Sequence, residues 1–234
     1  MSRRNVSALE RLRVLPDVFT SNMLGVLQGL SEDHVNTMIS SWRKVGLVQT
    51  MGMRKAGVHY NLLRDPEGPQ RRKGEALWLL LNAPSVTVGE AALNAGGWTT
   101  QMAHRVTVCT GVTPRLPTVP SGLDGIDLMP RPAAWMYELL TDAIEHGELV
   151  GDVLCASPAM ALADTMLANA RRTGEKVGAP MPWLPDPDDL EIPEEADLDR
   201  VRNCLKLLGA TAEEMEMVEP YAESIEAVSH YARR

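Results

Sequence analysis

Apolar side chains recur at helical spacing in the stretch from Ser31 to Gly46. Ser31 can cap the start of a helix and Gly46 can end it, because serine and glycine favour these two positions. A projection at about 100° per residue gathers five apolar residues into one stripe. They are Val35, Met38, Ile39, Trp42 and Val45. The pattern predicts a well-bounded helix with this stripe packed against a core.

The opposite face of the same helix is polar and basic. It carries Asn36, Thr37, Ser40, Arg43 and Lys44. Short hydrogen-bonding side chains and cations of this kind reach base edges and phosphates in a DNA major groove. We therefore predict that these five residues bind DNA.

A β-hairpin is predicted directly after the helix. Leu47 to Gln49 and Val58 to Leu62 have strand composition, and the turn between them contains Arg54 and Lys55 among glycines. The order helix, strand, basic turn, strand is typical of a winged helix-turn-helix, in which Arg54 and Lys55 would contact phosphates. The alternative is a solvated polar helix followed by a loop that happens to be basic.

The segments before this helix supply its expected packing partners. A support helix is predicted from about Ser7 to Val14 and a second short helix from about Ser21 to Leu27, closed by Gly29. The residues expected to face the apolar stripe, or to lie inward on the support helix, are Leu9, Leu12, Phe19, Leu24, Leu27 and Leu30.

A boundary is predicted after this region, because residues 64–74 combine turn formers with cations. Arg71, Arg72 and Lys73 either follow phosphates beside the wing or belong to an exposed linker without function. We place a DNA-binding domain at residues 1–75 and a second domain at residues 76–234.

The second domain has helical and strand patterns in alternation. Helices are expected at 75–81, 87–95, 132–146, 157–172, 198–208 and 212–231, and strands near 106–108 and 126–128. The fold class is α+β, with a winged helix-turn-helix followed by a mixed α/β domain that is mostly helical.

Charge divides the chain at the same place. Residues 1–75 hold 12 Lys and Arg against 7 Asp and Glu, a net charge of +5, whereas residues 76–234 hold 11 against 24, a net of −13. A basic domain suits phosphate, and an acidic one is repelled by it. Only the first domain is therefore expected to touch DNA, and the role of the acidic region after Pro185 stays open.

Sequence motifs for catalysis or cofactor binding are not found. The five histidines and three cysteines have no metal-ligand spacing, and no glycine-rich phosphate loop or nucleophile elbow occurs. We expect no enzyme activity, no cofactor and no metal; the competing catalytic interpretation is a metal bound by Asp186, Asp188 and Asp189. Without an apolar run of about 18 residues or a signal-peptide core, we expect a cytoplasmic protein that does not enter membranes.

Three pieces of the chain resemble the AbiEi family of antitoxins from abortive-infection toxin–antitoxin operons. The first is the winged helix at the N-terminus. The second is the block from Val86 to Trp98, VTVGEAALNAGGW, which is similar to the family's helix after the DNA-binding domain. The third is Ala156 to Asp164, ASPAMALAD, which is similar to the family's Ser-Pro-x-x-Ala-Leu-x-Asp helix start. The region after Pro185 has no counterpart in this pattern.

The resemblance implies an autorepressor and antitoxin. Its DNA-binding domain would repress the operon at inverted repeats, and its second domain would counteract a nucleotidyltransferase toxin, with or without direct contact. The alternative is a stand-alone winged-helix regulator whose second domain senses a small molecule, which a deep apolar pocket in that domain would favour. Inverted repeats require two protomers, yet no heptad repeat supplies a dimer seam, so the oligomeric state stays open.

Overall fold

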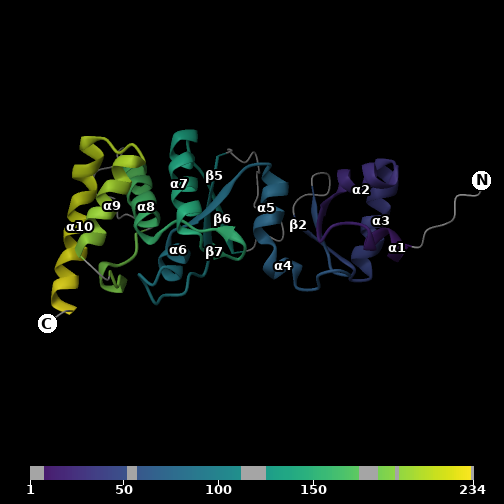
Figure 1. Ribbon diagram of the computed structural model, residues 1–234, viewed down its shortest axis with the longest axis horizontal. Coiled ribbons are helices and arrows are strands. Elements are labelled where there is room, and N and C mark those ends of the chain that lie inside the picture. Colours follow the sequence, from purple (N-terminus) through teal and green to yellow (C-terminus); the bar gives the residue numbers. More distant parts are fainter. Residues whose placement is uncertain (1–7, 52–56, 112–124, 174–183, 193–194, 233–234) are drawn as a thin grey trace, which may run out of the picture. The chain divides into compact units, whose positions relative to one another are not determined.

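The computed structural model describes residues 8–51, 57–111, 125–173, 184–192 and 195–232 (Figure 1). The chain divides into two compact units. Of the described residues, the first unit holds 8–51, 57–84 and Gly151–Val153, and the second unit holds the rest. The expected boundary after residue 75 falls inside a helix of the first unit, Lys73–Leu81. The first unit itself continues to Pro84.

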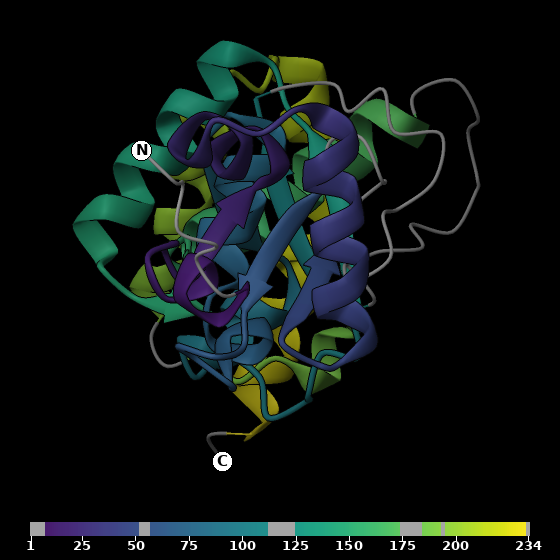
Figure 2. The ribbon, with the colours of Figure 1, turned by 90° about the vertical axis from the view of Figure 1, so that its right-hand side faces the viewer.

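The first unit opens with six elements in the order of a winged helix-turn-helix. They are α1 (Ala8–Arg13), β1 (Val18–Thr20), α2 (Ser21–Gln28), α3 (Glu32–Lys44), β2 (Val48–Met51) and β3 (Val58–Asn61). Figure 2 shows α3 beside the strands of the small sheet. This arrangement confirms the α+β class and gives the three expected helices and the expected pair of strands.

The sheet of the first unit has the order β1-β3-β2 and is antiparallel throughout. In register, Phe19 pairs with His59, and Thr50 pairs with His59 from the other side. Strand β1 was not predicted from the sequence, because a strand of three residues is too short to show an alternating pattern. As the central strand, β3 is buried at all four of its positions.

The core of this unit confirms most of the expected apolar stripe. Val35, Ile39 and Trp42 are buried, and they share one cluster with Leu12, Phe19 and Leu24, among others. Three expectations were wrong: Val45 is 65% exposed, Leu27 62% and Leu9 45%. Val45 is the C-cap residue of α3, so it lies beyond the last turn whose spacing places side chains on the core.

The stretch expected as a linker is folded. It contains α4 (Gly68–Arg71), followed by α5 (Lys73–Leu81), whose Ala76 and Leu77 are fully buried. Asp152 accepts hydrogen bonds from the backbone N–H groups of Gly74 (2.6 Å) and Glu75 (3.3 Å). The N-terminus of α5 is therefore capped by a residue more than 70 positions away along the chain, a contact that sequence spacing does not reveal.

The second unit combines a three-stranded sheet with longer helices. Its elements include β4 (Ser85–Val88), α6 (Glu90–Ala95), β5 (Val106–Thr110), β6 (Ile126–Pro130), α7 (Ala133–His146) and α8 (Pro158–Thr173). After them come η1 (Pro187–Asp189), α9 (Glu195–Leu207) and α10 (Ala212–Ala232). The short strands β7 (Leu149–Val150) and β8 (Val153–Leu154) flank the turn residues that belong to the first unit.

This sheet has the order β4-β5-β6, with β4 antiparallel and β6 parallel to β5. The prediction of one helix over 87–95 was wrong, because Val86 to Val88 form a strand and the helix starts only at Glu90. Gly89, at φ +67°, makes the turn between them. The β-branched run Val-Thr-Val fits a pleated strand better than a helix.

Helix α8 lies at the centre of the second unit's core. It packs against α9, α10, α6 and β4. Ala161, Leu162, Ala163 and Met166 are buried on this helix, which confirms the expected helix over 157–172. Asp142 fixes the start of the helix by accepting hydrogen bonds from the Ser157 N–H (2.6 Å) and hydroxyl (2.7 Å).

Candidate functional site

The turn between α2 and α3 sets the position of the candidate recognition helix. Gly29 ends α2 at φ +61°, a left-handed conformation that glycine adopts without strain. The Leu30 N–H donates to the Gly25 carbonyl at 3.0 Å, which closes the turn. Ser31 is the N-cap residue as predicted, but its hydroxyl bonds the His34 ring (2.9 Å) instead of a helix N–H.

The face of α3 opposite the core is open. All five residues expected to bind DNA from this helix are exposed: Asn36, Thr37, Ser40, Arg43 and Lys44. The Thr37 hydroxyl donates to the Asp33 carbonyl (2.8 Å), which leaves it able to accept a hydrogen bond. Among the described residues, the Asn36 and Ser40 side chains have no hydrogen-bond partner in the protein. Their polar groups are thus available to an external ligand.

Charge varies along this face. Glu32 and Asp33 are exposed in the first turn of α3, and Arg43 and Lys44 are exposed in the last turn. The arrangement complements the helix dipole, and it also places the cations at one end only. The cations of α3 therefore lie at its C-terminal end, with Asn36 and Ser40 between the two ends.

A buried histidine that no sequence motif marks ties the sheet to α2. The His59 ring lies 2.9 Å from the Ser21 hydroxyl and 2.9 Å from the Thr50 hydroxyl, with the Phe19 ring centroid at 5.2 Å. Burial, helped by the charge of Arg43, lowers the pKa of His59 to about 4, so the ring is neutral at neutral pH. Because every β3 residue is buried, no alternation along the strand marks His59 as inward.

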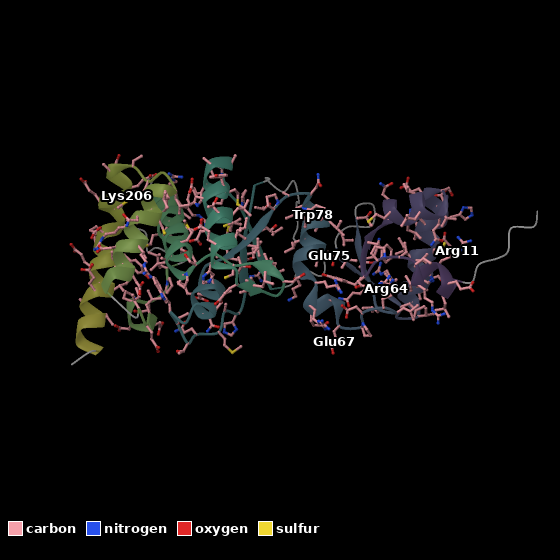
Figure 3. The ribbon with its side chains drawn as sticks, in the orientation of Figure 1. Arg11, Arg64, Glu67, Glu75, Trp78 and Lys206 are labelled. Carbon is pink, nitrogen blue, oxygen red and sulfur yellow. The ribbon has the colours of Figure 1, made fainter. Side chains whose placement is uncertain are left out.

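Charged residues after β3 are committed to the fold. Arg72 pairs with Asp17 (2.7 Å), Asp65 (2.8 Å) and Glu75 (3.2 Å). Arg64, labelled with Glu75 in Figure 3, pairs with Asp17 at 2.8 Å. Both cations therefore stabilise the first unit through ion pairs, which for Arg72 argues against one of the two alternatives, an exposed linker without function.

The remaining predicted DNA contacts, Arg54 and Lys55, lie outside the described residues. The strands that flank them pair from Val48 opposite Asn61 to Met51 opposite Val58. Asn61 is itself buried and donates to the Leu12 carbonyl at 2.8 Å, which joins the end of α1 to β3.

A cavity of about 630 Å³ lies in the second unit, between α8 and one face of its sheet. Asp164, at its wall, is 1% exposed and binds Arg131 through two bonds of 2.8 Å. Burial alone lowers the pKa of Arg131, but the hydrogen bonds and charge of Asp164 outweigh it and raise that pKa. Polar and charged groups line much of the cavity, so it differs from the deep apolar pocket that would identify a sensor most directly.

The acidic cluster near Pro187 has a local structural role. The Asp186 carboxylate accepts from the Asp188 N–H at 3.1 Å and caps η1. Within the described residues, no group of three or more His, Cys, Asp or Glu is arranged to hold a metal ion. None of the described helices is long and apolar enough to span a membrane.

Comparisons with known proteins give one structural similarity. No protein-family profile matches the chain, and no curated protein matches it. The fold is similar to a solved structure described as the crystal structure of RV2827C protein from Mycobacterium tuberculosis, with a TM-score of 0.46 and 16% sequence identity. The alignment covers 91% of this chain and 79% of the other. A similarity at this level carries no inference about function.

Proposed function

We propose that this protein is a sequence-specific DNA-binding repressor that reads duplex DNA with α3. The observation that carries the proposal is the division of this helix into two faces. Val35, Ile39 and Trp42 are 3%, 6% and 2% exposed, whereas all five polar and cationic residues of the other face are exposed. Helix-turn-helix proteins place such a helix in the major groove. A cytoplasmic location belongs to the same proposal.

Direct base contacts are assigned to Asn36 and Ser40, and phosphate contacts to Arg43 and Lys44. Asparagine reads adenine through two hydrogen bonds, and a bidentate contact of this kind is worth about 1–3 kcal/mol of discrimination. Cation contacts to phosphate are independent of sequence and weaken with salt, because binding releases condensed counterions. The two sets should therefore separate in binding assays.

The test uses the full chain and duplexes that tile the promoter-proximal DNA of its own gene. We expect one duplex to shift, and Asn36→Ala or Ser40→Ala to weaken that complex by roughly 5- to 150-fold with little change for unrelated duplexes. Asn203→Ala is the matched control, since Asn203 is an exposed asparagine on α9 in the acidic unit. It should leave the shift unchanged.

Substitutions of the cations should act differently. Arg43→Ala or Lys44→Ala should weaken binding to all duplexes and reduce the slope of log affinity against log salt by about one per phosphate contact. If every promoter-proximal duplex stayed unshifted, or if Asn36→Ala and Asn203→Ala behaved alike, the assignment of α3 as the reading helix would be wrong.

The antitoxin role rests on the AbiEi resemblance and is proposed for the second unit. We expect co-expression to restore growth to cells that carry a neighbouring nucleotidyltransferase toxin. A variant with Asn36→Ala and Ser40→Ala combined should lose repression and keep this protection, because the changed side chains are exposed in the first unit. Loss of protection by a folded variant would place α3 in the neutralising surface.

A second candidate function is ligand-responsive regulation, and the cavity of the second unit favours it. Its volume of about 630 Å³ lies within the range of about 300–1,000 Å³ that small-molecule sites occupy. A ligand of this cavity would then change affinity for the same duplex in the gel-shift assay. If a saturating concentration of the ligand left the affinity for the duplex unchanged, the cavity would not act as a sensor for DNA binding.

A further inference from the structure

The walls of the cavity come from the three-stranded sheet and from helix α8 of the second unit. Its floor includes the cross-strand row of Val88, Thr107 and Asp127, which are register partners on β4, β5 and β6. One wall is the face of α8 that carries Asp164, Thr165, Ala168, Asn169 and Arg172. Residues three and four apart share a helix face, so these side chains border one space. A site on a strand and a helix keeps its geometry better than a site on loops.

Among the described residues that line the cavity, the charges balance. Three arginines, Arg105, Arg131 and Arg172, oppose three carboxylates, Glu90, Asp127 and Asp164. Arg105 binds Asp127 through bonds of 2.7 and 2.6 Å, and Arg131 binds Asp164 through two bonds of 2.8 Å. Neither sign of charge dominates, so a ligand with several charges of one sign, such as a nucleoside triphosphate, gains no net attraction.

Arg131 retains one donor that its described protein partners do not use. Its Nε and Nη2 bind Asp164, and its Nη1 makes one long contact of 3.5 Å to the Pro130 carbonyl. A guanidinium has five N–H groups, and Arg131 also shares a side-chain hydrogen bond with Cys109, so among the described residues one N–H remains without an acceptor. The side chain is 13% exposed and lines the cavity. Asp164 and the Trp135 ring, 4.9 Å from the guanidinium carbon, hold it in place.

Apolar side chains border the rest of the cavity. They are Val88, Met129, Pro130, Ala168 and Leu184. A fixed guanidinium in a mostly buried setting favours an oxyanion through short, charge-assisted hydrogen bonds. The apolar groups favour a hydrocarbon or aromatic body.

We infer that this cavity binds a small organic monocarboxylate, with the carboxylate on Arg131 and the apolar body against Met129 and Ala168. The inference names the ligand class for the second candidate function, ligand-responsive regulation. It rests on that candidate function only in so far as the bound ligand is said to regulate DNA binding. Carboxylate binding itself needs no DNA.

Binding is tested on the full chain with the fluorescent aromatic sulfonate 8-anilinonaphthalene-1-sulfonate, displaced by benzoate or by its neutral analogue benzamide. We expect the fluorescent probe to bind and benzoate to displace it at least tenfold more effectively than benzamide. The difference should arise because only benzoate presents an anion to Arg131.

Ala168→Leu is the blocking variant, since Ala168 lines the cavity and three added carbons project into it. Ala227→Leu is its matched control, an exposed alanine on α10 that does not line the cavity. Circular dichroism confirms that both variants fold. Benzoate-sensitive fluorescence should fall at least tenfold in Ala168→Leu and stay at the wild-type level in Ala227→Leu.

Each other outcome overturns a part of the inference. Equal displacement by benzamide would remove the role of Arg131, and equal fluorescence in both variants would place the probe outside the cavity. No benzoate-sensitive binding to the wild-type chain would overturn the site altogether. The gel shift of the promoter-proximal duplex is measured separately, so such a result leaves the proposed DNA binding intact.

Discussion

Replacing Trp42 by alanine tests the orientation of α3. Trp42 is 2% exposed and packs in the cluster that joins α3 to α1 and α2. A buried tryptophan removes about 150–250 Å² from water, which at about 25 cal/mol per Å² corresponds to roughly 4–6 kcal/mol. Measured costs of Trp→Ala in cores are about 3–5 kcal/mol, because neighbours relax into part of the cavity. We expect the lower range, about 3–5 kcal/mol, for Trp42→Ala.

Hydrogen exchange of backbone amides measures this cost within each unit. The amides of β3, the central strand of the first sheet, should lose protection by a factor of about 100 to 5,000, since each 1.4 kcal/mol is tenfold. The amides of β5 lie in the second unit and provide an internal reference that should not change. Global denaturation would combine the two units and obscure the result.

Val45→Ala is the control on the same segment. The sequence pattern placed Val45 on the buried stripe, but it is 65% exposed, so its truncation should change stability by no more than about 0.5 kcal/mol. If Val45→Ala reduced β3 protection as much as Trp42→Ala, or if Trp42→Ala left β3 protection unchanged, α3 would face the core differently from the structure.

Three further perturbations probe particular contacts. Lowering the pH from 7 to 5 should destabilise the first unit by about 2 kcal/mol. The folded state keeps His59 neutral with a pKa of about 4, whereas the unfolded chain binds a proton there with a pKa of about 6.5. Hydrogen exchange should show no such loss in His59→Gln. Gly74→Ala should lower the melting temperature, at a cost of about 1–3 kcal/mol, because a Cβ there collides with the Asp152 backbone carbonyl; an unchanged melting temperature would refute the close approach. Asp164→Asn leaves its arginine buried without a counter-charge and should cost about 3–5 kcal/mol by hydrogen exchange of the β5 amides, against less than about 1 kcal/mol for Asp127→Asn in the more exposed pair; equal costs would contradict the difference in burial.

Local signals in the sequence were sufficient for the elements of the recognition region. The stripe of Val35, Ile39 and Trp42, the N-cap at Ser31 and the stop before Gly46 are set by residues within a few positions of one another. The same holds for Gly29, which ends α2, and for the β2 and β3 pair. Helix periodicity and glycine geometry act locally, so the spacing of residues along the chain is enough to assign the polar face of α3.

Contacts between distant residues could not be predicted in this way. The Arg64–Gly74 stretch has a linker's composition, yet Arg72 is held by Asp17, and Gly74 by Asp152, across long separations in sequence. Likewise, Thr87 to Ala95 has a composition that both helix and strand tolerate, and pairing with β5 decided in favour of a strand for its first residues. Propensity yields to tertiary context in such segments.

The sequence by itself determined the α+β class, the helices of the winged region, and the separation of a basic part from an acidic one, because each follows from spacing or composition. Only the tertiary structure decided which arginines form ion pairs with carboxylates of the protein, that His59 is buried and neutral, and that Arg131 and Asp164 meet at a cavity. The physical reason is that desolvation and ion pairing depend on which groups come together in space. The spacing of residues along the chain does not predict these contacts when the partners are tens of residues apart.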